Sequence, residues 1–211
     1  KDFLLLNKLS ASEGLSQLFS LEIELLHEED ELDGFETTII APEDILGKPV
    51  TINITQSEGS RYFTGIINRF SQGNRNRRFS YYYATVVPHV WILTQNIQSR
   101  IFQHLSVPDI LKKVFKGFEV KYEIQGDFKP RNYCVQYQES DFDFASRLME
   151  EEGIYYYFEH DGKMDKMILG NTPQSHQNCP NKSEIPYVVE KLTADVWQSA
   201  IKSWRTEYIL Q

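Results

Sequence analysis

The sequence contains few cysteines, no long apolar run and no cationic leader. Cys134 and Cys179 are the only cysteines among 211 residues. Two cysteines are too few for the disulfide framework of a small secreted domain, so we expect free thiols and a reducing interior. No run of about 18 apolar residues is present, and the first residues lack a basic region followed by an apolar run. We therefore expect no membrane-spanning segment and no signal peptide.

Basic residues are missing from one long acidic segment. Between Glu13 and Asp44 lie 11 of the 30 acidic residues and no Lys or Arg. The whole chain carries a formal charge of −8, so the remainder is slightly basic. Because a nucleic-acid binder needs a net-basic domain face, we expect no nucleic-acid partner. We interpret residues 28–36 as an extended acidic loop and the densest basic cluster as a solvated hairpin tip, formed by Arg69, Arg75, Arg77 and Arg78.

The motifs of catalysis and cofactor binding are also missing. G-x-S-x-G, G-x-G-x-x-G and G-K-[ST] do not occur, and neither cysteine lies in a catalytic signature. His176 and Cys179 have the spacing of two zinc ligands, but no second pair accompanies them. The acids at 150–152 are adjacent helical residues, which point in different directions and cannot converge on one glycosidic bond. We predict no catalytic, metal-binding or cofactor-binding residue and no cofactor.

The same acidic triplet conflicts with helix electrostatics. Glu150, Glu151 and Glu152 end a predicted helix, where each exposed negative charge opposes the macrodipole by roughly 0.3–1 kcal/mol. Arg147 lies three and four residues before the first two acids and offsets part of this cost. We expect Arg131, in a neighbouring strand or subunit, to supply the rest. These four residues, Arg131 and the triplet, are candidate assembly charges.

The first 97 residues show the period-two pattern of half-buried antiparallel strands. Phe19, Leu21, Ile23 and Leu25 fall on one face of a strand over residues 19–26. Glu58-Gly59 and Gly73-Asn74 are predicted turns that join the following strands. Together these segments predict a small antiparallel β-barrel or sandwich. The other expected strands are 3–6, 50–54, 61–70 and 79–87, the last with Phe79, Tyr81, Tyr83, Thr85 and Val87 on one side.

After residue 100 the pattern changes to α+β. Helices are predicted over residues 107–116 and 141–152, with Ser106 and Ser140 as N-caps and glycines after each C-terminus. A strand follows each helix, with Val120, Tyr122 and Ile124 inward after the first. Asp161-Gly162 is the strongest hairpin signal in the chain. The fold class is therefore mainly β, with an α+β insertion.

Two aromatic features point outward. Tyr81-Tyr82-Tyr83 and Tyr155-Tyr156-Tyr157 place rings on both faces of their strands, so at least one ring in each faces away from the local core, toward a subunit or a stacked sugar. Residues 170–186 lack apolar periodicity and are predicted to be a linker. The last 25 residues are apolar again, and we expect them to begin a core that needs partners outside this chain; they include Val196, Trp197, Ile201, Trp204, Tyr208 and Ile209.

One long motif closely resembles the signature of the VgrG proteins, the spike components of bacterial type VI secretion systems. It is RNYCVQYQESDFDFASRLMEEEGIYYYFEH, at residues 131–160. Three further segments match in order: EGLSQLFSLEIELL at 13–26, FTGIINRFSQG at 63–73 and PHVWILTQNIQSRIFQHLSVPDIL at 88–111. The signature positions, read as folding and packing positions and not as a catalytic set, are Tyr133, Gln136, Tyr137, Ser140, Asp141, Phe142, Leu148, Glu151, Glu152, Gly153 and Ile154.

The resemblance implies a fold similar to the baseplate hub of contractile-tailed phages. Two small β-barrels per chain assemble as a homotrimer, so that six barrels form a ring matching a hexameric tube. On this mapping residues 1–97 are the first barrel, 98–170 the α+β insertion, and 171–211 a linker and the start of a truncated second barrel. Such chains normally continue into an oligonucleotide-fold domain and a β-helical spike.

The function implied is that of a non-enzymatic hub in a contractile injection machine. Its expected partners are its own copies and the hexameric tube protein, with effectors as further candidates. We expect it in the cytoplasm during assembly and outside the cell after ejection through the type VI apparatus. A phage or prophage tail hub is the alternative within this class. A cell-wall glycan hydrolase or a glycan-binding module is the alternative from another class.

Overall fold

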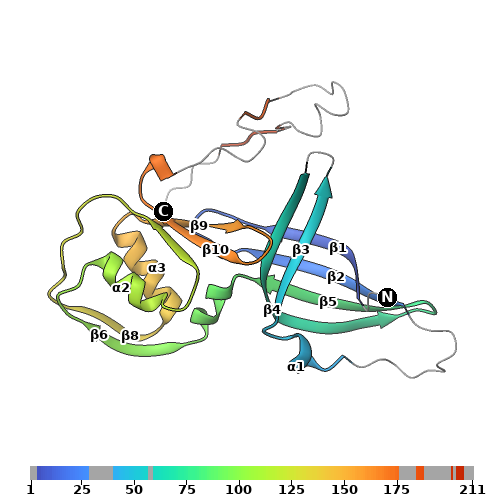
Figure 1. Ribbon diagram of the computed structural model, residues 1–211. Helices are drawn as coiled ribbons and strands as arrows, with labels where there is room; N and C mark the ends of the chain where they lie inside the picture. The colour runs from blue at the N-terminus through green and yellow to red at the C-terminus, as the bar shows by residue number, and fades with distance from the viewer. Residues whose placement is uncertain are drawn as a thin grey trace. The chain divides into compact units, whose positions relative to one another are not determined.

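The computed structural model describes residues 4–28, 40–56, 59–175, 184–187, 201 and 203–206. The chain divides into two compact units, residues 1–175 and 176–211. All the helices and strands named below belong to the first unit (Figure 1). No helix in the described ranges is long and apolar enough to cross a membrane.

The first part of this unit is a curled antiparallel sheet. Its strands are β1 (Leu5–Ser12), β2 (Ser20–Glu28), β5 (Phe79–Val87), β4 (Gly59–Arg75) and β3 (Pro49–Gln56), paired in that order (Figure 1). Within the described strands β1 does not pair with β3, so the curled sheet is a half-barrel, which agrees with the small antiparallel barrel expected for this region. Helix α1 (Pro42–Ile45) adds the partly buried Ile45 to its core.

Period-two burial explains the central strands of the half-barrel. Leu21 and Ile23 of β2 are buried as predicted. On β5 the buried alternation is Ser80, Tyr82, Ala84 and Val86, so the face carrying Tyr83 is the outer one. Tyr82 is 1% exposed and stacks on Phe70, whereas Tyr83 is 44% exposed. The prediction that one tyrosine of this triplet faces away from the core is confirmed.

The predicted turn at Gly73-Asn74 is wrong. Strand β4 continues to Arg75, and the chain reverses at residues 76–78, where Asn76 Oδ1 accepts the backbone N–H groups of Arg78 and Phe79. Gly73 serves a different purpose, because a Cβ there would lie 2.5 Å from the ring of Tyr83 on β5. Part of the basic cluster consequently lies on a strand, and Arg78 at the tip pairs with Glu28 at 3.2 Å.

The second part of the unit is the predicted α+β region. Strands β7 (Val120–Glu123), β10 (Asp165–Gly170) and β9 (Tyr155–His160) form a sheet in that order, with β7 parallel to β10. Strand β6 (Ile97–Phe102) pairs antiparallel with β8 (Cys134–Ser140). Helices α2 (Val107–Val114) and α3 (Asp141–Glu151) pack in one buried cluster with residues of both sheets. Two short 3-10 helices complete the unit, η1 (His89–Thr94) and η2 (Pro173–Ser175).

Local signals fix the ends of both long helices. The Ser106 hydroxyl accepts the Asp109 N–H at 3.4 Å, and the Ser140 hydroxyl accepts the Asp143 N–H at 3.0 Å. Such caps contribute about 0.5–2 kcal/mol each. After α3 the chain leaves through Gly153 at φ +67°, a left-handed conformation that favours glycine. The predicted helices are confirmed, and so is the β9–β10 hairpin at Asp161-Gly162.

The β9–β10 hairpin joins the two parts. Among the described residues the buried apolar side chains form two clusters, and Phe158 of β9 packs against both. The His160 ring accepts the backbone N–H of Thr64 on β4 through Nδ1 at 3.1 Å. Asp165 of β10 accepts the backbone N–H of His89 at 2.9 Å and also contacts its ring. Strand β9 is thereby anchored to β4 of the half-barrel, and β10 to η1, which follows β5 in the chain.

Several predicted features fall on residues that the structure does not describe. These are residues 29–36 of the acidic loop, Glu58 of one predicted turn, and Val196, Trp197, Tyr208 and Ile209 of the apolar tail. In the second unit Tyr187 and Ile201 form an isolated parallel bridge, and Trp204 is 76% exposed. The division of the chain at residues 97 and 170 stays a prediction.

Candidate functional site

The buried polar signature positions gather where β8 turns into α3. Gln136, Ser140 and Asp141 are buried, at 0%, 4% and 3% exposure. The Asp141 carboxylate accepts from Asn96 Nδ2 at 2.7 Å, from Gln136 Nε2 at 2.8 Å and from the Arg100 guanidinium. Arg100 Nε also donates to Gln136 Oε1 at 2.8 Å. This network ties β6 to the first turn of α3, and no pattern in the sequence identified Asn96 or Arg100 as its members.

Apolar signature positions fill the core beside this network. Phe142, Leu148 and Ile154 are buried, at 6%, 0% and 4% exposure. Tyr133 and Tyr137 behave differently, because they are 58% and 69% exposed. Their expected role as packing positions is therefore wrong within this chain. Their neighbours on β8 alternate with them and point inward.

The acidic triplet receives the charge expected of it. Arg131 donates through Nη1 to Glu151 and through Nη2 to Glu152, both at 2.6 Å. Arg147 donates to Glu151 at 3.3 Å. The hydrogen bond from Arg131 is the main cause that lowers the pKa of Glu151, and the bond to Glu152 is the main cause that raises the pKa of Arg131. These contacts lie within one chain, and the assembly role of Arg131, Glu150, Glu151 and Glu152 stays a prediction.

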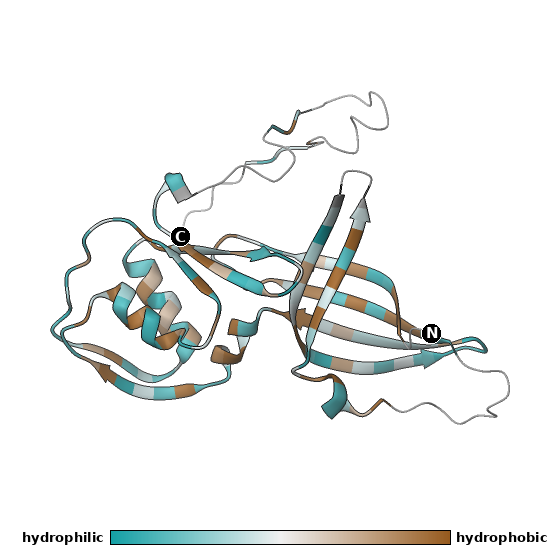
Figure 2. Cartoon of the chain, in the orientation of Figure 1, coloured by the Kyte–Doolittle hydropathy of each residue, from teal (hydrophilic) through white to brown (hydrophobic). Residues whose placement is uncertain are grey.

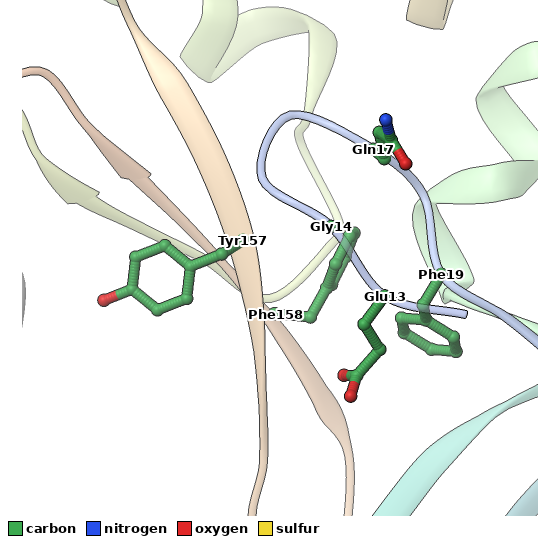
Figure 3. Close-up of a pocket in the computed structure, with 6 residues that line it drawn as sticks. All are labelled: Glu13, Gly14, Gln17, Phe19, Tyr157 and Phe158. Atoms are coloured by element: carbon green, nitrogen blue, oxygen red, sulfur yellow. The ribbon is translucent and has the colours of Figure 1, made fainter. Parts of the chain in front are cut away.

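A small cavity lies at the junction of half-barrel and hairpin. It measures about 250 Å³ and is lined by Glu13, Gly14, Gln17, Phe19, Tyr157 and Phe158. In Figure 3 the Glu13 side chain extends beside the ring of Phe19, while Tyr157 points away on the other side of β9. Glu13 pairs with Arg61 at 2.5 Å and lies 3.4 Å from His160 Nε2. The neighbouring His160 ring is the main cause that lowers the pKa of Glu13.

Two observations bear on metal binding and thiol reactivity in the described residues. In the part of the chain that the structure covers, no three His, Cys, Asp or Glu side chains meet in a way that would hold a metal ion. Cys134 is a buried free thiol, and burial raises its pKa, which disfavours the reactive thiolate. His176 and Cys179, the weak zinc candidates, lie outside the described residues.

Comparison with known proteins places this arrangement in a family. Residues 12–210 match the family described as phage tail baseplate hub (GPD). Over 192 residues the chain is 38% identical to the type VI secretion system spike protein VgrG1b of Pseudomonas aeruginosa, covering 88% of this chain and 25% of that protein. The chain thus spans about a quarter of that relative's length. The sequence resemblance to VgrG proteins is confirmed.

Solved structures show the same fold. The Escherichia coli protein c3393, a type VI secretion component with structural similarity to the T4 tail proteins gp27 and gp5, superposes with a TM-score of 0.69 at 22% identity. That match covers 83% of this chain and 50% of c3393. A prophage MuSo2 tail protein from Shewanella oneidensis gives 0.52 at 11% identity, covering 87% and 55%. The family match over residues 12–210 includes both the half-barrel and the α+β region. The chain belongs to the phage tail baseplate hub family.

Proposed function

We propose that the chain is the hub region of a type VI secretion spike, a structural component that is trimeric in the assembled machine. The observation that carries this proposal is the coincidence of fold and sequence. The family match spans residues 12–210, and the 38% identity to VgrG1b runs through the half-barrel and the α+β region alike. A purely local motif would not extend across two separate cores.

In the assembled hub, residues 1–97 form one barrel-type domain of the ring and 98–170 its insertion. The half-barrel supports this assignment, because β1 lies at one edge of its sheet and β3 at the other. Residues 171–211 lead into the second barrel-type domain. The hub docks on the hexameric tube protein, and effectors are further partners of the complete spike. It assembles in the cytoplasm and leaves the cell with the tube.

The hub acts by binding and not by catalysis. The buried polar side chains at the signature are engaged in fixing β6, β8 and α3, which leaves them unavailable to a substrate. Enzymatic activity, where a spike protein has it, would reside in a region other than this one. One observation supports the alternative function, a prophage tail hub. This is the likeness of the fold to that of the MuSo2 tail protein.

Light scattering on the purified protein, alone and with purified tube protein, tests the proposal. We expect a trimer, and co-elution of that trimer with the tube hexamer. In cells, we expect the protein in the medium only when the sheath can contract. A complete protein that stays monomeric, or that never binds the tube, would contradict the proposed function. Binding only to a prophage tube would favour the alternative.

A further inference from the structure

The outer face of the β6–β8 sheet exposes a set of uncharged, mostly apolar side chains. Along the two strands the exposed positions are Ile97, Ser99, Ile101, Tyr137 and Gln138, and Tyr133 lies just before β8 on the same side as Tyr137. None of these side chains carries a charge. We call Ile97, Ser99, Ile101, Tyr133 and Tyr137 the β6–β8 patch. Figure 2 shows brown, hydrophobic segments alternating with teal and pale ones along this sheet.

The inner face of the same sheet is fully occupied. Phe102 and Cys134 are buried in the cluster formed with α2 and α3, and Gln136 is bonded to Asp141. The alternation of a strand then forces its other residues outward. Ile97 and Ile101 are 69% and 60% exposed, although isoleucine is among the residues most often buried.

The size of the β6–β8 patch is that of a large apolar patch on a monomer and of part of a protein interface. Its four large side chains, at 58–69% exposure, leave on the order of 500 Å² of apolar surface in water. That lies at the upper end of patches on monomers, about 300–600 Å², and is more than half of the roughly 800 Å² that each partner contributes to a standard interface. Tyrosine-rich composition is typical of interface centres.

Charge indicates which face two copies of the chain can share. Each copy carries −8, so two copies repel wherever their acidic surfaces meet. Repulsion is weakest where two uncharged faces meet, and the side chains of the β6–β8 patch carry no charge. We propose that the β6–β8 patch of one copy is covered by a neighbouring copy in the assembled hub. This inference rests on the proposed function, because it takes the hub to be an oligomer.

Two surface variants with a matched control test the proposal. Ile101→Ser and Tyr137→Ser each remove one exposed apolar side chain, and Leu15→Ser does the same in the loop before β2, where Leu15 is 58% exposed. Circular dichroism checks that all three remain folded. In sedimentation experiments we expect each patch variant to weaken assembly about 30-fold, the effect of losing an interface hot spot. Leu15→Ser should assemble like the unmodified protein.

Hydroxyl-radical footprinting reads the same face directly. We expect Tyr133 and Tyr137 to be protected in the assembled protein and to become reactive on dilution to monomers, while Tyr83 on the half-barrel keeps its reactivity. If the protein assembles but both patch tyrosines stay reactive, the patch proposal is overturned and the trimer stands. Protection that appears only on addition of tube protein would identify the tube as the occupant and would overturn self-contact. A protein that never assembles would overturn both.

Discussion

The sharpest stability prediction concerns Asp141 at the start of α3. Its side chain is 4% exposed and accepts hydrogen bonds from Asn96, Gln136 and Arg100. Asp141→Ala leaves the Arg100 guanidinium, itself 30% exposed, without its carboxylate. Breaking a buried charge pair costs about 3–5 kcal/mol. Because Arg100 retains some water and its bond to Gln136, we expect a loss of about 3 kcal/mol in the free energy of unfolding.

A double-mutant cycle separates this pair from other effects of the carboxylate. Arg100→Met should destabilise by a similar amount, since it leaves the buried Asp141 charge without its cation. The double variant should cost clearly less than the sum of both, with a coupling energy of about 2 kcal/mol. Asp143→Ala is the matched control, because Asp143 is an exposed acid in the same helical turn. It should cost about 1 kcal/mol through the cap and the helix dipole.

Urea unfolding at pH 7, followed by far-ultraviolet circular dichroism, measures these differences. Variants with an unchanged dependence on urea can be compared directly through their midpoints. The reasoning fails if Asp141→Ala costs no more than Asp143→Ala. It also fails if the Arg100 and Asp141 effects add within about 0.5 kcal/mol, since independent sites behave in that way.

Three further changes test other contacts. Arg131→Met should lower the free energy of unfolding by about 1 kcal/mol at pH 7. Because Arg131 lowers the pKa of Glu151, this stabilisation is present above the unfolded pKa of about 4.3 and is lost as the pH falls through the folded pKa. Equal losses at pH 7 and pH 3 in urea unfolding would contradict this ion-pair contribution. Phe158→Ala should cost about 3 kcal/mol and reduce hydrogen-exchange protection in both clusters, not in one alone. Gly65→Ala should cost at least about 2 kcal/mol by thermal unfolding, because its Cβ would lie 2.4 Å from the Val87 carbonyl oxygen of β5; an unchanged Tm would refute that clash.

Local patterns in the sequence predicted much of the fold. Ser140 announces a helix because its hydroxyl needs only the amide three residues on, and Gly153 ends it because glycine tolerates the left-handed conformation observed there. Leu21 and Ile23 reveal the inner face of β2 through alternation alone. Each of these signals depends on residues only a few positions apart. A single sequence was therefore enough to predict these helix ends and the inner face of β2.

Contacts between distant segments were not predictable in the same way. The pairing of β6 with β8 joins residues 32 to 43 positions apart, from Phe102–Cys134 to Ile97–Ser140, and the pairing of β7 with β10 joins residues 47 positions apart, so no local period marks either pairing. In the sequence Asp141 and Asp143 look alike as acids in the first turn of a helix. Only the position of Arg100 on β6 makes Asp141 the buried one. The turn at Gly73 was predicted from glycine's usual role, whereas in the structure Gly73 lies within β4 and leaves room for the ring of Tyr83 on β5.

Strand β8 inverts the usual distribution of polar and apolar residues, and this inversion connects the core to the surface. Gln136 is 0% exposed while Tyr137 is 69% exposed. A buried amide is tolerated only when its hydrogen bonds are made, and Gln136 meets that condition through Asp141, Arg100 and the Glu139 carbonyl. The alternation of the strand then leaves Tyr137 outside. The contacts that anchor α3 to β6 thus set the register of β8 that exposes the β6–β8 patch. A one-residue shift of β8 would turn Tyr137 inward and Gln136 outward, so the buried hydrogen bonds and the exposed patch would be lost together.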